Sequence, residues 1–330
     1  MNKKMTSAEI GKIWAVHMGN TLSQCVLSYF LQHVEDEEIQ TVVNDALSLT
    51  NDLLERTNKL FMDENYPTPI GLTEKDVDLN APRLFSDLFY LYYLKYVAKA
   101  GLSIYSTAIP IMLKPDVKEF ILYSNSATIK LITKVNEALD KKGRLQQPAS
   151  IPIPTNVTFV TKQSYLNGVF GEVRPLHALE IAHLFDNIEN NVTSKALLIG
   201  FNQVAKNDDV RSFLHRGKKM TSHHVEQLTE KLYKEDLPAP PLVDDLVEAT
   251  TIPPFSDKLM MSHKIDMFSM KIRTYANAMS LNGRRDIGTM YGKLIFDTGR
   301  YVEDGANIMI DHGWMEQPPH AVDRDYLASN

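Results

Sequence analysis

The tripeptide Phe85-Ser86-Asp87 recurs 170 residues later as Phe255-Ser256-Asp257, and this pair sets the frame for the whole chain. At the same spacing, the hexapeptide Gly143-Arg144-Leu145-Gln146-Gln147-Pro148 is echoed by Gly313-Trp314-Met315-Glu316-Gln317-Pro318. Upstream the spacing becomes 171, as between Glu9-Ile10 and Glu180-Ile181. A self-similarity that keeps its order along the chain, with a slip of one residue, indicates an internal duplication.

Each copy contains four stretches with the apolar periodicity of a helix. They span 7–33, 37–63, 85–109 and 115–142 in the first copy, and 178–206, 208–234, 257–281 and 285–312 in the second. Between the second and third stretch lies a long, proline-rich connection, at about 64–84 and 235–256. At ~3.3 Å per extended residue, it can run the length of helices that are ~38 Å long. A ferritin-like bundle needs such a crossover, so we predict an all-α chain of two tandem ferritin-like four-helix bundles; an up-down order with a decorated loop is the alternative.

The duplication divides the chain into a first bundle at 1–147, a proline-rich linker at 148–175 and a second bundle at 176–330. The stretch 85–109 is aromatic on several faces. Because a helix that is apolar nearly all round is covered on more than one side, we expect this helix to contact the second bundle. A homo-oligomer interface is the alternative.

The composition is that of a soluble globular protein, with 44% hydrophobic and 23% charged residues. A net charge of -6 leaves no basic excess for phosphates, which argues against general nucleic-acid binding. No uncharged apolar run approaches the ~20 residues of a membrane span. The start, 1–7, has no signal-peptide pattern, and the single cysteine, Cys25, fits a reducing compartment. We therefore expect a cytoplasmic protein with a buried, inert thiol.

A ferritin-like bundle invites a search for a di-iron site, which takes glutamates from two helices and Glu-x-x-His pairs from the other two. Only Glu180-Ile181-Ala182-His183 has this order in a helix, and it lies at the helix start, so a standard di-iron centre is not expected. His224 lies on an apolar stripe where the first copy has Leu53. With Asp297 and Asp304 it remains a candidate ligand for iron, manganese or zinc; the alternative is a core histidine held by one hydrogen bond. No catalytic or cofactor-binding residue is assigned.

Two other polar groups have open interpretations. His17, Asn20 and Gln24 share one helix face, where they either line a small polar cavity or form a hydrogen-bonded seam. Asn20 matches Asn191, which favours a structural role in both copies. The segment Gly283-Arg284-Arg285-Asp286 is typical of a helix start with two exposed arginines and is a candidate anion site.

Several blocks resemble a known family: 80–87, 256–261, 303–310 and 313–319. They resemble a tandem-repeat domain-of-unknown-function family of endospore-forming bacteria, which is similar to spore coat protein F. The resemblance covers essentially the whole chain. It implies a ferritin-like bundle in each half and a possible spore association, and it assigns no catalytic residue.

Three functions follow from these observations. The leading interpretation is a non-enzymatic helical-bundle protein, spore-coat-like, that acts structurally or by binding a protein partner or a second copy of itself. The alternative is a metal-binding protein or metal-dependent oxidoreductase that uses the second bundle. The third is a small-molecule carrier whose cavity is lined by four methionines, although methionines at helical spacing more often fill a core. These methionines are Met260, Met261, Met267 and Met270.

Overall fold

The computed structural model describes residues 4–168 and 170–329. The first bundle consists of α1 (Ser7–His33), α2 (Glu37–Asp63), α3 (Asp87–Ala108) and α4 (Pro115–Lys141). The second consists of α5 (Ala178–Val204), α6 (Asp208–Tyr233), α7 (Asp257–Leu281) and α8 (Arg285–Asp311). All eight helices are confirmed to within two residues at each end. The predicted absence of a signal peptide rests partly on residues 1–3, which lie outside the described range.

Short elements that the sequence did not predict occupy the connections. The helix α9 (Arg324–Ser329) follows the second bundle. Four single 3-10 turns are η1 (Glu74–Asp76), η2 (Ile109–Ile111), η3 (Gln163–Leu166) and η4 (Asp244–Leu246). The all-α class is confirmed, since the described residues contain two isolated β-bridges and no extended strand.

Contacts at the two ends of each bundle define its topology. Glu9, in the first turn of α1, accepts a hydrogen bond from the backbone N–H of Lys114 at the start of α4. At the other end, Asp87 of α3 accepts one from the backbone N–H of Asp36, where α1 passes into α2. Hence α2 and α3 run parallel, and the connection between them crosses the bundle, as the ferritin-like topology requires. The second bundle repeats both contacts, at Glu180 and Arg284 and at Asp257 and Asn207.

The two crossovers meet in a reciprocal arrangement. Val77 forms an antiparallel bridge with Phe255, and Phe85 forms one with Val247. Val247 and Phe255 are the repeat equivalents of Val77 and Phe85, so an approximate two-fold axis relates the two bridges. The neighbouring backbone hydrogen bonds are also reciprocal: Ser86 N–H to Leu246 O, and Ser256 N–H to Asp76 O. The copies therefore associate like an isologous dimer within one chain.

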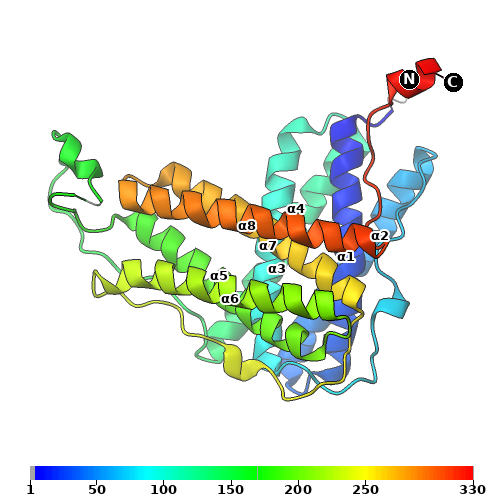
Figure 1. The fold of residues 1–330 in the computed structure, drawn as a ribbon, viewed down its shortest axis with the longest axis horizontal. Coiled ribbons are helices and arrows are strands. Elements are labelled where there is room, and N and C mark those ends of the chain that lie inside the picture. The colour runs from blue at the N-terminus through cyan, green and yellow to red at the C-terminus, as the bar shows by residue number, and fades with distance from the viewer. Residues whose placement is uncertain (1–3, 169, 330) are drawn as a thin grey trace.

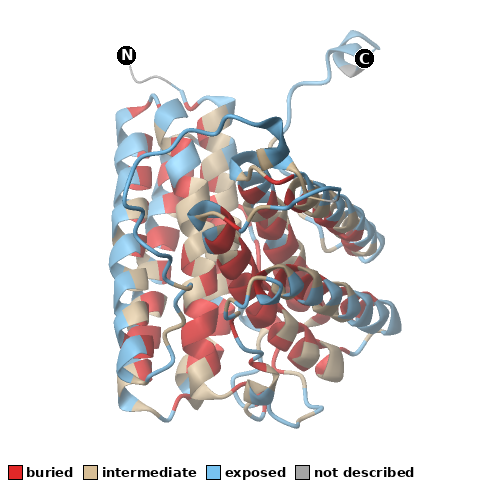
Figure 2. Cartoon of the chain, turned by 90° about the vertical axis from the view of Figure 1, so that its left-hand side faces the viewer, coloured by how far each residue is buried: buried red, intermediate tan, exposed pale blue. Residues whose placement is uncertain are grey.

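The bundles cross steeply, with α3 between them (Figure 1). The Tyr93 hydroxyl shares a hydrogen bond of 2.7 Å with Nε2 of His263, its own repeat equivalent. One step further, the Tyr96 hydroxyl donates to the backbone oxygen of Met267 at 2.9 Å. One apolar core contains residues of both bundles, and buried residues concentrate where the bundles meet (Figure 2). The predicted packing of the aromatic helix against the second bundle is confirmed.

The segment between the bundles is open to solvent. Every residue from 150 to 164 is exposed, and the stretch 157–160 has no regular structure. The division of the chain at 148 and 175 stays a prediction. Among the helices of residues 4–168 and 170–329, none has the length and apolar character needed to cross a membrane.

Candidate functional site

A cavity of about 440 Å³ lies inside the first bundle and extends to α7 of the second. Its size falls within the roughly 300–1,000 Å³ of small-molecule sites. The inner wall consists mainly of apolar and small residues from α1 to α4, including Leu49, Leu53, Ala98, Gly101, Thr128 and Leu131. On the α7 side the wall is polar, with Ser262, Asp266, Ser269 and Arg273. The cavity thus has an apolar interior and a polar rim.

Larger side chains fill the corresponding place in the second bundle. The equivalent pairs are Ala98 and Phe268, Gly101 and Lys271, and Leu131 and Tyr301. Phe268, Lys271 and Tyr301 are all buried. The ring centroids of Phe268 and Tyr301 lie 4.6 Å apart, and Nζ of Lys271 lies 4.2 Å from the Phe268 centroid. The same helical frame therefore has a hollow version and a filled version.

Two buried lysines belong to this filling. Nζ of Lys264 donates to Oγ of Ser194 at 2.9 Å, and Nζ of Lys271 donates to Oγ1 of Thr221 at 3.1 Å. Burial lowers the pKa of both amines well below the usual range, which favours their neutral forms. Sequence reasoning missed them, although two lysines seven residues apart on the stripe of Met267 were an available signal.

Only one of the four predicted cavity methionines lines the cavity. Met267 contributes to its wall, whereas Met260, Met261 and Met270 are buried in the core shared by the two bundles. The prediction of a methionine-lined cavity is therefore wrong for three residues. They lie on parts of α7 that face apolar neighbours, and there the flexible side chain fills irregular space.

His224 is fully buried in the second bundle. Its Nδ1 lies 3.2 Å from the hydroxyl of Tyr275, to which Nδ2 of Asn191 donates at 2.8 Å. Burial lowers the pKa of His224 to about 3, so the ring is neutral at ordinary pH. Its Nε2 has no hydrogen-bond partner among the described residues. His224 is thus a core histidine with one hydrogen bond.

The two acidic candidates lie apart from such a site. Asp304 pairs with Nη1 of Arg216 at 2.7 Å on the surface, and Asp297 is partly buried on α8. Within residues 4–168 and 170–329, no three His, Cys, Asp or Glu side chains are placed together to hold a metal ion. The structure does not bring His224, Asp297 and Asp304 together, and the metal hypothesis remains a prediction without a defined site.

The polar residues of α1, His17, Asn20 and Gln24, were predicted either to line a small polar cavity or to form a hydrogen-bonded seam, and the structure places them in different surroundings. His17 is buried, with Nδ1 2.9 Å from Oγ1 of Thr57, whereas Gln24 donates to Asn51 at the surface. Asn20 lines the cavity, and its side-chain amide donates to the backbone oxygen of Val16 at 2.7 Å. The second copy repeats this bond from Asn191 to the backbone oxygen of Asn187 at 2.7 Å, which supports a structural role in both copies.

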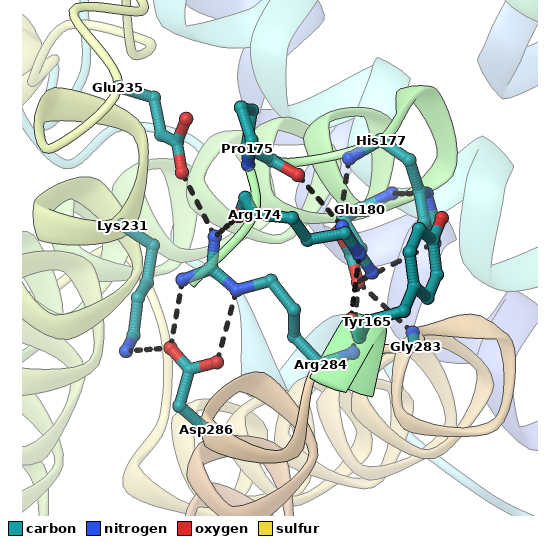
Figure 3. A network of polar contacts seen from close by, with 10 residues as sticks. All are labelled: Tyr165, Arg174, Pro175, His177, Glu180, Lys231, Glu235, Gly283, Arg284 and Asp286. Carbon is teal, nitrogen blue, oxygen red and sulfur yellow. Dashed lines mark hydrogen bonds and ion pairs between the residues drawn. The ribbon is translucent and has the colours of Figure 1, made fainter. Parts of the chain in front are cut away.

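A charged network joins the helices at the end of the second bundle where α5 and α8 begin and α6 ends (Figure 3). The Arg284 guanidinium donates to Glu235 at 2.9 Å and to Asp286 at 3.1 Å, and its side chain is only 8% exposed. The prediction of two exposed arginines is wrong for Arg284, because two carboxylates engage it; Arg285 is exposed. The first bundle has the same arrangement, with Lys114 bound to Glu64 and Asp116. The repeated network is structural and offers no anion site at Arg284.

Fold and cavity together define a class: a duplicated ferritin-like four-helix bundle whose first unit is hollow. The chain belongs to the family described as "Protein of unknown function (DUF3231)", whose model matches residues 1–157 and 164–327, once for each bundle. This confirms the family resemblance. The chain is also similar to the crystal structure of a "putative spore coat protein" from Bacillus halodurans, with 16% identity and a TM-score of 0.42. That match covers 46% of this chain and 98% of the other. A comparison with curated proteins finds no match.

Proposed function

We propose that this protein is a non-catalytic binding protein that takes up a small, largely apolar molecule in the first bundle. The observation that supports the proposal is the contrast between the two copies at one place. Residues Ala98, Gly101 and Leu131 leave a cavity of about 440 Å³ where the other copy places two rings and a lysine.

Empty apolar space destabilises a fold. In engineered cores the loss is ~24 cal/mol per Å³ of enclosed cavity. This cavity is partly open to solvent, so its apolar wall instead forgoes burial worth ~25 cal/mol per Å² unless a ligand covers it. The second copy demonstrates that this helical frame accepts a filled core, with Phe268 and Tyr301 both buried. A retained cavity in the first copy is therefore best explained by a ligand that occupies it.

The proposed place of action is the cytoplasm. The single cysteine, Cys25, is buried, and burial raises the pKa of its thiol to about 11, as befits an unreactive core residue. A spore association is expected from the family resemblance. A homo-oligomer stays a prediction without a defined surface, because the aromatic helix that suggested it packs against the second bundle. Immunolocalisation in sporulating cells and sedimentation analysis of the purified protein test these two expectations.

The test of binding uses 1-octanol as a neutral, mostly apolar probe. We expect the wild type to bind it with about one equivalent in a calorimetric titration. Ala98→Phe places in the cavity the ring that the second copy carries there, and it should abolish binding while the helical circular dichroism is kept. Ala276→Phe is the matched control, because Ala276 is exposed on α7 and outside the cavity.

Two results would overturn the proposal. One is a wild-type protein that neither binds 1-octanol nor releases any small molecule on extraction with organic solvent. The other is an Ala98→Phe protein that folds and binds as the wild type does. If Ala98→Phe fails to fold, Leu131→Tyr serves as a second variant, because it introduces the other ring of the filled core.

A further inference from the structure

Two threonines inside the first bundle have hydroxyl groups without a hydrogen-bond partner. Thr50 of α2 and Thr128 of α4 both line the cavity, and each residue is only 5% exposed. Neither hydroxyl group forms a hydrogen bond with any of residues 4–168 and 170–329. Neither oxygen is sealed among protein atoms, so both face the open space of the cavity. Because buried hydroxyl groups normally have a partner, this pair indicates where a polar group of a ligand would lie.

The two threonines lie at the same level of the bundle. Helices α2 and α4 run antiparallel, and ion pairs between them define their register: Lys134 pairs with Asp45, and Lys141 pairs with Glu38. Thr50 follows Asp45 by five residues along α2, and Thr128 precedes Lys134 by six residues along α4. The two hydroxyl groups therefore face the cavity at one level, where a single polar group can lie beside both.

The second copy shows which group lies beside the equivalent threonines, Thr221 and Thr298. Nζ of Lys271 donates to Oγ1 of Thr221 at 3.1 Å, and Thr298 donates to the backbone oxygen of Leu294 at 2.6 Å. Burial lowers the pKa of the Lys271 amine well below its usual range, which favours its neutral form. In the filled bundle, the partner of the threonine on α6 is therefore a neutral donor at the end of an unbranched alkyl chain.

Gly101 is the repeat equivalent of Lys271, and it leaves the place of that chain empty. A Cβ atom at this position would have the ring of Tyr105 as its nearest neighbour, with three ring and hydroxyl atoms at 3.2–3.7 Å. Both residues line the cavity. The first bundle thus keeps the threonine on α2 and lacks the alkyl donor that would satisfy it.

Other polar groups of the wall are satisfied without a ligand. Nζ of Lys258 donates to the backbone oxygen of Gly71 at 2.9 Å, and Glu316 accepts the backbone N–H of the same residue at 3.0 Å. Helices α1 to α4 add no charged side chain to the described wall, so a charged group beside the two threonines would lack a counter-ion. Water can hydrate the polar side chains on the α7 side, because they are partly or fully exposed: Ser262, Asp266, Ser269 and Arg273.

We propose that the cavity binds an unbranched aliphatic alcohol whose hydroxyl group lies at the inner wall, where it donates to Thr50 and accepts from Thr128. This inference rests on the proposed function, because it assigns the polar end of the ligand to the same cavity. The alkyl chain occupies the space beside Gly101, and the hydroxyl group takes the place that the lysine amine has in the second copy.

1-Octanol and n-nonane are chains of equal length, but only 1-octanol has a hydroxyl group. Binding of both volatile probes to the full chain is measured by headspace gas chromatography. Thr50→Val keeps the shape of the side chain and removes the acceptor, so we expect it to weaken 1-octanol binding about fivefold and to leave nonane binding unchanged. Thr41→Val is the matched control, because Thr41 is exposed on the same helix and lies outside the cavity.

Gly101→Lys adds an independent test, because it introduces the lysine of the second copy and should abolish binding of both probes while the helical circular dichroism is kept. Equal 1-octanol affinity in Thr50→Val and wild type, or an equal loss for the two probes, would overturn the inference. So would a folded Gly101→Lys protein that binds 1-octanol as the wild type does. If Thr50→Val does not fold, Thr128→Val takes its place. If neither probe binds to the wild type, the proposed function fails; if both bind and Thr50→Val weakens neither, only the assignment of the hydroxyl group fails.

Discussion

Replacing Glu180 by glutamine removes the charge at the centre of the network that closes the second bundle (Figure 3). The Glu180 side chain is fully buried. It accepts two hydrogen bonds of 2.8 Å from the Arg174 guanidinium and bonds of 3.0 Å from the backbone N–H groups of His177 and Gly283. Burial raises the pKa of this carboxyl, but these donors outweigh burial and lower it from 4.5 to about 2. Because a tenfold change in proton affinity is worth about 1.4 kcal/mol, the charged form of Glu180 contributes ~3 kcal/mol.

The sign of the pH dependence follows from the lowered pKa. The contribution of Glu180 is present above the unfolded-state pKa of about 4.5 and is lost as the pH falls toward 2. We expect Glu180→Gln to lower the free energy of unfolding by ~3 kcal/mol at pH 7, measured by urea denaturation, and by clearly less at pH 3. Glu9→Gln is the matched control, because Glu9 binds Thr6 and backbone N–H groups with no guanidinium, so its loss should be smaller. Equal losses for Glu180→Gln at pH 7 and pH 3 would refute the reasoning.

Three further predictions concern the filled core, the pairing of the copies and the metal hypothesis. Phe268→Ala removes the ring that packs on Lys271 and should lower the free energy of unfolding by ~3–5 kcal/mol; a loss below ~1 kcal/mol in urea would show that the ring does not hold the second bundle. Cleavage at a protease site inserted into residues 150–164 should leave the bundles associated, because the crossovers pair reciprocally; two separate species in native gel filtration would contradict this. His224→Leu should leave the metal content of untagged protein unchanged by plasma mass spectrometry; about one equivalent of iron, manganese or zinc that disappears in the variant would establish a metal site instead.

The helices could be predicted closely because their end signals are local. Thr6 caps α1 through a reciprocal hydrogen-bond pair with Glu9, and Asp36 caps α2 through its side chain. Gly143 and Gly313 follow the last turns of α4 and α8 with φ of 64° and 65°, a conformation that favours glycine. Such signals depend on residues three or four apart, so a pattern along the chain contains them. The crossover topology could also be predicted, because the connection between the second and third helices of each copy is long enough to run the length of the bundle.

The cavity could not be predicted because it depends on side-chain volumes that meet only in the fold. Ala98, Gly101 and Leu131 are unremarkable residues along the sequence, and their effect appears only when α3 and α4 face each other. A position-by-position comparison of the two copies would have been the available signal, since each of these residues has a larger counterpart. Arg284 was placed on the surface for a similar reason: Glu235, which engages it, lies 49 residues away.

A duplicated chain can hold an asymmetry that a symmetric dimer cannot. In a dimer of identical chains, every residue occurs twice. Both bundles would therefore be hollow or both filled, and the two equivalent contacts between the copies, α3 on α5 and α7 on α1, would carry the same ion pairs. Here the reciprocal bridges of Val77 and Phe85 preserve the two-fold frame. Within that frame, Phe268 fills the second bundle only. Lys99 of α3 forms ion pairs with Asp186 and Glu189 of α5, and its repeat equivalent, Ser269, carries no charge. The first bundle, whose equivalent positions carry Ala98, Gly101 and Leu131, keeps the cavity in which the proposed ligand binds. The difference between a hollow first bundle and a filled second bundle is thus possible because the two copies are joined in one chain and can carry different residues at equivalent positions.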